Sequence, residues 1–208
     1  MKKFLLPLLL ALGLGSAHAA TSVSPDVVVK EGTDKMRELI AANHVAYAAN
    51  KPQFYAKVDE VLVPLFDVKY ISQLVLGKNW KVATPEQRTR FQVAFKSALI
   101  RNYADALLEN YDSVDVKFQP VRLSPDATDA IVKCVLTRKV GTPVSLSFAM
   151  REVDGVWKIF DTTIENLSLV TSIKSQYAVE IQKNGLEALI KRVEAGQVVV
   201  DESTIVKK

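Results

Sequence analysis

The clearest pattern in this chain is a pair of predicted strands joined by a tight turn. From Val144 to Met150, apolar residues alternate with Ser or Ala, which is the period-two pattern of a strand with one apolar face. Asp154-Gly155 then supplies the residues that a type I′ hairpin turn requires. The segment 156–164 alternates between two faces, with Val156, Phe160 and Ile164 on one and Trp157, Ile159 and Asp161 on the other. Both faces must therefore be covered, either by helices or by an apolar ligand in a cavity.

Two earlier segments show a similar alternation and extend the predicted sheet. Residues 114–118 form a first strand, and Pro120 places that strand at an edge or a bulge. Residues 130–137 form a second strand with apolar groups on both faces, interrupted by Lys133. Because the connections between these segments are short, the four strands predict an antiparallel meander.

The segments before the predicted sheet have the residue patterns of helices. Ser24-Pro25-Asp26 combines the cap, the proline and the acidic residue of a helix start, and this helix runs to about Ala42. Asn50-Lys51-Pro52 breaks the chain before a second helical segment that ends at Phe66. Gly77 ends a third, short helix.

The longest predicted helix lies just before the first strand. Trp80 is expected in a loop, and Thr84-Pro85-Glu86-Gln87 then forms a capping box that opens a helix running to Asn110. Its apolar residues share one stripe, whereas its basic residues lie off that stripe. The stripe consists of Phe91, Phe95, Ala98, Leu99, Tyr103, Ala106 and Leu107. Such a stripe predicts either a core face or the wall of a ligand site.

Two helices are expected after the sheet. Ser168 caps a helical segment that Asn184-Gly185 ends, and residues 186–194 form a last amphipathic helix. No internal repeat or linker interrupts the chain. The pattern therefore predicts one α+β domain, with N-terminal helices, a four-stranded antiparallel sheet and C-terminal helices.

The N-terminal segment predicts an exported protein. Residues 1–19 have the positive start, the apolar run and the small-residue cleavage site of a secretory signal, so the mature chain should begin at Ala20. The apolar run is about half the ~20 residues that a spanning helix needs. We therefore expect a soluble protein of the bacterial periplasm, with one domain over 20–196 and a poorly ordered tail over 197–208.

Charge and single reactive residues narrow the function classes. The chain has 27 Lys and Arg against 23 Asp and Glu, and loss of Lys2 and Lys3 with the signal leaves 25 against 23, a net charge of +2. This charge is too small for a nucleic-acid binder. Cys134, the only Cys, should be a buried inert thiol, with a reactive or intermolecular thiol as the alternative. His44 is expected to be a surface residue rather than a metal ligand or a base.

Catalytic signatures are absent from the sequence. There is no Gly-rich phosphate loop, no zinc spacing of Cys and His, and no Gly-x-Ser-x-Gly elbow. Asp161 and Glu165 could share a face as paired carboxylates, but solvation at a strand end is the commoner outcome. The sequence thus favours binding over catalysis, with no metal and no cofactor.

A set of short motifs occurs in a fixed order along the chain. The set comprises Leu76-Gly77-Lys78-Asn79-Trp80, Thr84-Pro85-Glu86-Gln87, Phe91, Phe95, Tyr103, Asp154-Gly155-Val156-Trp157-Lys158-Ile159-Phe160-Asp161, Ser168-Leu169-Val170, Lys174-Ser175-Gln176 and Gly185-Leu186. This ordered set resembles the MlaC family of periplasmic phospholipid-binding proteins, also called the toluene-tolerance family. The resemblance covers roughly residues 27–197, and the chain departs from the family pattern at Asn166-Leu167 and at Lys174.

The resemblance implies a soluble, monomeric carrier of one phospholipid. Such a carrier would exchange lipid, through transient contacts, between an outer-membrane lipoprotein complex and an inner-membrane ABC transporter that carries an MCE-domain protein. The implied fold is a curved antiparallel sheet cradled by helices, cone-shaped and NTF2-like, with the acyl chains in an apolar cavity and the headgroup near solvent. The family has no catalytic residues and no cofactor.

The resemblance and the apolar pattern together nominate site residues. The predicted cavity wall consists of Phe95, Leu99, Tyr103, Leu107, Val132, Cys134, Leu146, Phe148, Met150 and Ile159. The basic residues Lys78, Lys81, Arg88 and Arg90 are candidates for docking on acidic partners, with plain solubility as the alternative.

Three other function classes stay open at this point. An enzyme on a similar scaffold would need a polar dyad in the cavity. A binding protein for small hydrophobic solvents would have a cavity too short for two acyl chains. A chaperone or structural adaptor would present an exposed groove and purify without lipid.

Overall fold

The computed structural model describes residues 23–124, 126–139 and 141–197. The predicted signal peptide 1–19 and the predicted tail from residue 198 onward lie outside the described residues. The described chain combines helices with one antiparallel sheet, which confirms the predicted α+β class. The helical segments are α1 (Pro25–Ala49), α2 (Lys51–Val61), η1 (Val63–Leu65), α3 (Val68–Leu76), α4 (Lys78–Val82), α5 (Pro85–Asn110), α6 (Leu169–Asn184) and α7 (Leu186–Glu194).

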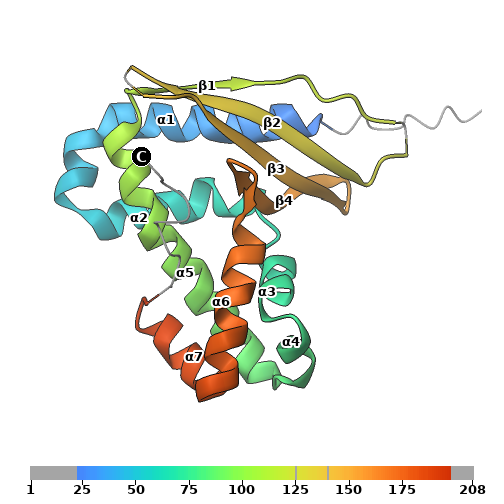
Figure 1. Ribbon diagram of the computed structural model, residues 1–208. Coiled ribbons are helices and arrows are strands. Elements are labelled where there is room, and N and C mark those ends of the chain that lie inside the picture. Colours follow the sequence, from blue (N-terminus) through green and yellow to red (C-terminus); the bar gives the residue numbers. More distant parts are fainter. Residues whose placement is uncertain (1–22, 125, 140, 198–208) are drawn as a thin grey trace, which may run out of the picture.

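The strands form a curved, open meander in the order β1-β2-β3-β4-β5 (Figure 1). They span β1 (Val114–Phe118), β2 (Asp129–Arg138), β3 (Val144–Val153), β4 (Val156–Ile164) and β5 (Leu167–Ser168). Four of these strands match the prediction, and the two-residue β5 is an addition. It forms because Glu165 and Asn166 adopt positive φ values of 47° and 68°, which turn the chain back onto β4. Asn tolerates a positive φ, but Glu rarely adopts one, so the sequence did not predict this turn.

The hairpin between β3 and β4 confirms one prediction and corrects another. Asp154 and Gly155 have φ values of 52° and 80°, as a type I′ turn requires. A bulge then places Met150 opposite Ile159 but Ala149 opposite Asp161, so Phe160 is the extra residue. The predictions that Ile164 shares a face with Phe160 and that Asp161 shares a face with Ile159 are therefore wrong. The bulge resets the alternation and brings Ile164 to the face that carries Ile159.

The helices follow their predicted caps and differ at three boundaries. The capping box of Thr84 and Gln87 is present at the start of α5. The first helix continues past its expected end to Ala49, although Asn43 departs from helical geometry and kinks it. The second helix stops at Val61, because Pro64 lacks the backbone N–H that a longer helix needs. Trp80 lies in the short helix α4 rather than in a loop.

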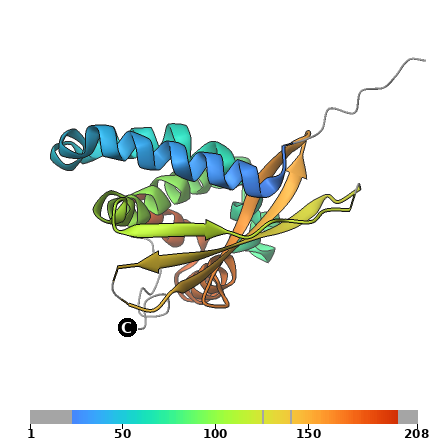
Figure 2. The same cartoon turned by 90° about the horizontal axis from the view of Figure 1, so that it is seen from above.

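Three groups of buried residues hold these elements together. One group joins α3, α5, α6 and α7, a second joins α1, α2 and α5, and a third places Val29 of α1 against the sheet. Figure 2 shows α1 and α5 on the same side of the strands. Helix α5 therefore links the helical cluster of α3, α6 and α7 to the layer of α1 and α2 that lies beside the sheet.

Candidate functional site

The sheet face that packs against α1 is called the inner face here. Val132, Met150 and Ile159 are completely or almost completely buried on it and contact the group around Val29. Residues that lie directly opposite each other on neighbouring strands point to the same face of the sheet. The residue pairs between β1, β2, β3 and β4 therefore show which other side chains lie on the inner face. Eight of these are apolar and only partly buried. Two of them, Phe118 and Phe148, pack against the group around Val29, and we call the other six the open strip. The open strip consists of Val114, Val116, Leu136, Val144, Leu146 and Ile164.

Burial on the inner face changes in one direction along the strands. On β2, Val132 is fully buried and Cys134 is 2% exposed, whereas Leu136 is only partly buried. The neighbouring strand repeats this trend, since Met150 is fully buried and Leu146 is only partly buried. One half of the inner face is therefore packed core. The other half is an apolar surface that the described helices leave partly uncovered.

Helix α5 carries a second apolar stripe of intermediate burial. Leu99, Tyr103 and Leu107 follow each other at intervals of four residues, so they lie on one face of the helix. Leu107 is 40% exposed, and Leu99 and Tyr103 are partly buried. The adjacent stripe of α5, which includes Ala104 and Leu108, is buried against α1 and α2. The first stripe is thus less buried than the second, although Leu99 packs against the helical cluster.

The predicted wall residues divide into packed and partly exposed positions. Phe95 is 1% exposed and stacks on Phe91 with ring centroids 5.3 Å apart, inside the helical cluster. The remaining core positions are Val132, Met150 and Ile159, together with buried Cys134 and partly buried Phe148 beside them. Leu99, Tyr103, Leu107 and Leu146 are the wall candidates with partly exposed side chains. Contact of any of these residues with lipid stays a prediction.

The predicted docking residues have different surroundings. Arg90 forms ion pairs of 2.8 Å with both Glu187 and Glu194 of α7. Arg88 donates to the backbone oxygen of Trp80 at 2.9 Å and lies over its ring, with 5.4 Å to the ring centroid. Lys78 and Lys81 are the two exposed members of the group. Both arginines thus hold α5 to its neighbours, and a docking role of the group stays a prediction.

Side chains considered for chemistry have structural partners in the fold. Burial raises the pKa of the Cys134 thiol to about 11, which disfavours the reactive thiolate. Asp161 accepts hydrogen bonds from Ser168 Oγ at 2.5 Å and from the Val170 backbone N–H at 3.1 Å, at the start of α6. Glu165 accepts from the backbone N–H of Ser145. The two carboxylates therefore order the turn and the helix start around β5.

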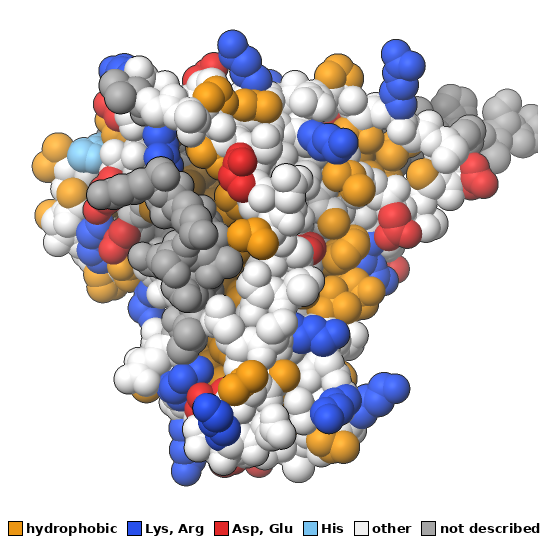
Figure 3. Space-filling view, in the orientation of Figure 1, with side chains coloured by type: hydrophobic (Ala, Val, Ile, Leu, Met, Phe, Trp, Pro, Cys, Tyr) orange, Lys and Arg blue, Asp and Glu red, His pale blue; other side chains and the backbone are white. Residues whose placement is uncertain are grey.

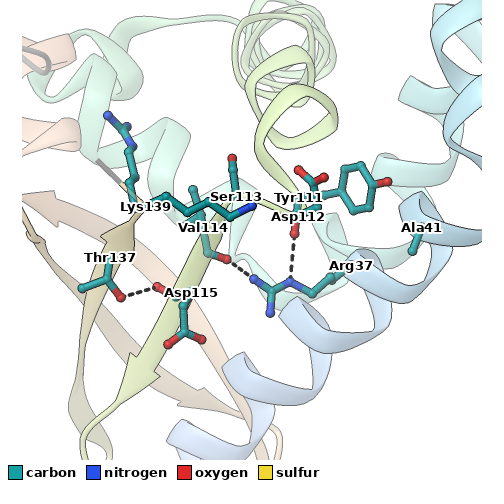
Figure 4. A pocket seen from close by; sticks show the side chains of 10 residues that line it. Arg37, Ala41, Tyr111, Asp112, Ser113, Val114, Asp115, Thr137 and Lys139 are labelled. Carbon is teal, nitrogen blue, oxygen red and sulfur yellow. Dashed lines mark hydrogen bonds between the residues drawn. The ribbon is translucent and has the colours of Figure 1, made fainter. Parts of the chain in front are cut away.

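A cavity of about 580 Å³ lies where α1, the α5–β1 turn and the end of β2 meet (Figure 4). Arg37 donates to the backbone oxygens of Tyr111, at 3.1 Å, and Val114. Arg138, the last residue of β2, and Lys139, which follows it, line the same cavity. Sequence reasoning missed these residues, because they come from separate segments and share no spacing that could announce a site.

The surface shows no concentration of one charge on the face seen in Figure 3. Lys and Arg side chains are spread over that face, and hydrophobic side chains gather over the strands. Within the described residues, no helix is long and apolar enough to cross a membrane. No group of three or more His, Cys, Asp or Glu side chains in that part of the chain could hold a metal ion.

Comparisons with known proteins give a consistent picture. A family model described as "MlaC protein" matches residues 30–195. The chain is 29% identical to the toluene tolerance protein ttg2D of Pseudomonas putida over 186 residues, which cover 89% of this chain and 84% of that protein. It is 24% identical to the intermembrane phospholipid transport system binding protein MlaC of Haemophilus influenzae over 193 residues, which cover 91% and 90% of the two chains.

A solved structure extends the likeness to three dimensions. The phospholipid-binding protein from Ralstonia solanacearum, solved in complex with a phospholipid, superposes with a TM-score of 0.76 and 31% sequence identity. The match covers 84% of this chain and 97% of that chain. From the family model, the relatives and the shared architecture, the chain belongs to the MlaC family.

Proposed function

We propose that this protein is a periplasmic carrier that binds one diacyl phospholipid and moves it between two membrane complexes. The complexes are an outer-membrane lipoprotein complex and an inner-membrane ABC transporter with an MCE-domain protein. Membership of the MlaC family supports the proposal, as do a relative named for intermembrane phospholipid transport and a related structure that holds a phospholipid. On this proposal the protein is not an enzyme and uses no cofactor.

The observation that carries the proposal is the open strip. Two acyl chains contain about 30 methylenes, and at ~0.8 kcal/mol each their exposure to water costs roughly 24 kcal/mol. A soluble carrier must therefore offer apolar surface that its own core does not use. The open strip, with partly buried Leu146 and Ile164, provides such surface on a sheet whose other half is tightly packed.

The decisive experiment is native mass spectrometry of the purified mature protein, followed by organic extraction and lipid analysis. We expect a population heavier by the mass of one diacyl phospholipid. A lipid-free mass that persists after incubation with phospholipid vesicles would contradict the carrier function. Retention of toluene under the same conditions would then favour a solvent-binding protein, and no binding of either would favour an adaptor.

A variant pair connects the lipid to the open strip. Leu146→Glu places a carboxylate against the acyl chains, so we expect lipid occupancy to fall at least roughly tenfold while the domain stays folded. The matched control is Ile131→Glu, because Ile131 is 59% exposed on the outer face of the same sheet. Circular dichroism verifies the fold of both variants. Equal occupancy in Leu146→Glu and Ile131→Glu would show that the lipid lies elsewhere.

A further inference from the structure

The cavity in Figure 4 adjoins the open strip. Val114 of β1 and Arg138 of β2 are cross-strand partners, and both line the cavity. The next inner-face pair along the same strands is Val116 and Leu136, which belong to the open strip. The cavity therefore lies at the end of the apolar surface where the inner face reaches solvent.

None of the three cations that line this cavity forms an ion pair within the described residues. Arg37 uses its guanidinium to hold the backbone oxygens of Tyr111 and Val114. Neither Arg138 nor Lys139 forms an ion pair with any residue that the structure describes.

The directions of the side chains fit an anion. In Figure 4, Lys139 reaches across the cavity toward Ser113, and Asp115 points its carboxylate away from both Lys139 and Arg37. Asp112 also lines the cavity, so its lining carries three cationic and two anionic side chains.

The inner face of β2 changes from charged to apolar along its length. Arg138 is exposed, Leu136 is partly buried, and Cys134 and Val132 are almost or completely buried. At ~3.3 Å per residue, the distance from Arg138 to Cys134 is about 13 Å, which is close to the ~15 Å of one leaflet of a bilayer's hydrocarbon core. This order of cation, apolar surface and closed core matches the order of groups along a phospholipid.

We propose that Arg138 and Lys139 form a binding site for the headgroup phosphate of the lipid cargo, with the acyl chains running along the inner face toward Cys134. The inference rests on the proposed carrier function. Arg and Lys are the side chains that make charge-assisted hydrogen bonds to phosphate, and a guanidinium can do so with two parallel N–H groups. The cavity of about 580 Å³ is large enough for a headgroup beside these cations.

The test offers the protein two lipids that differ only in the phosphate. Mature protein freed of lipid is incubated with vesicles of phosphatidylglycerol that contain a minor fraction of diacylglycerol with the same acyl chains. Mass spectrometry then gives the ratio of the two lipids on the protein relative to the vesicles. The variant is Arg138→Gln/Lys139→Gln. Its matched control is Lys117→Gln/Lys133→Gln, which removes two exposed cations from the outer face of the same two strands.

We expect the wild type to favour phosphatidylglycerol over diacylglycerol. The variant should lose this preference by roughly tenfold, the effect of removing one or two charge-assisted hydrogen bonds at a partly exposed site. Diacylglycerol uptake and the control should be unchanged. An unchanged preference in the variant overturns the headgroup site while leaving the carrier function intact. A wild type that takes up neither lipid contradicts the carrier function itself.

Inorganic phosphate distinguishes a headgroup site from a site for free phosphate. In an NMR titration of lipid-free protein with inorganic phosphate, we expect weak shifts of the Arg138 and Lys139 amides. The same titration of lipid-loaded protein should show none, because the headgroup occupies the site. Equal phosphate binding in both forms would assign the cavity to a free anion and overturn the proposal.

Discussion

Gly32 lies where the side chain of Leu65 crosses α1. A Cβ atom at this position would be 2.4 Å from Leu65 Cδ1, well inside van der Waals contact. Leu65 in turn packs against the group of buried residues between α1 and the sheet. Gly32 is thus the residue that lets η1 approach α1.

Gly32→Val tests this close approach. We expect a loss of about 1–3 kcal/mol in the free energy of unfolding, because the added methyl groups displace Leu65. Urea denaturation measures the loss, and a double-mutant cycle with Leu65→Ala assigns it. If Gly32→Val costs the same in the Leu65→Ala background, the clash with Leu65 is not its cause.

Asp161 shows how a residue that could take part in chemistry serves structure instead. Its two carboxylate oxygens accept from Ser168 and Val170, so it orders the first turn of α6. The bulge at Phe160 gives it this position, and the same bulge sends Phe160 to Tyr70, with ring centroids 5.6 Å apart. From the sequence, a catalytic pair of Asp161 and Glu165 was the less favoured alternative to solvation at a strand end.

At the scale of elements, α5 and α7 are joined by packing and by charge. Arg90 of α5 donates hydrogen bonds to the carboxylates of Glu187 and Glu194 of α7. These hydrogen bonds hold the pKa of both carboxyls below the ordinary value of 4.5. A carboxyl whose pKa is lower in the folded state stabilises the fold above its unfolded pKa, and this stabilisation is lost as the pH falls. The three side chains are open to solvent, so their contribution is small and sensitive to salt.

Arg90→Met should therefore flatten the acid side of the stability profile. Between about pH 6 and about pH 3, we expect the melting temperature of the variant to fall less than that of the wild type. Lys78→Met is the control, because Lys78 is exposed and has no ion-pair partner within the described residues. Thermal unfolding at a series of pH values measures both. An identical acid slope in the wild type and Arg90→Met would contradict the role of these ion pairs.

At the scale of the whole molecule, the inner face divides the protein into a scaffold and a site. The buried half, around Val132 and Met150, needs no ligand to exclude water. The open strip needs a ligand to exclude water, because its apolar side chains remain partly exposed in the protein alone. Binding of lipid to the folded state should therefore stabilise the whole domain.

The melting temperature should rise when lipid-free protein is loaded with phospholipid. A ligand at about 100 times its Kd adds ~2.7 kcal/mol, which corresponds to roughly 5–10 °C for a domain of this size. Differential scanning calorimetry of delipidated and reloaded protein measures the shift. In Leu146→Glu, the rise in melting temperature on loading with phospholipid should be small. A shift of equal size in Leu146→Glu, or none in loaded wild type, would contradict stabilisation through the open strip.

Local signals in the sequence determined much of the architecture. The period-two segments, the Asp154-Gly155 turn and the capping box at Thr84 depend on neighbouring residues alone, and each is present in the fold. The kink at Asn43 and the end of α2 before Pro64 also lie at residues that disfavour helix. The set of family motifs, spread over the whole chain, predicted the MlaC family before any contact was known.

Only the tertiary structure decided which apolar residues are core and which remain open. Phe95 and Leu99 belong to the same helical stripe, yet the first is buried among aromatic rings and the second is partly exposed. The bulge that moves Ile164 to the inner face depends on how β4 pairs with β3. The cavity of Arg37, Arg138 and Lys139 joins segments about a hundred residues apart. Burial, register and cavities are set by packing between distant segments, whereas periodicity and caps are set within a few residues of the chain.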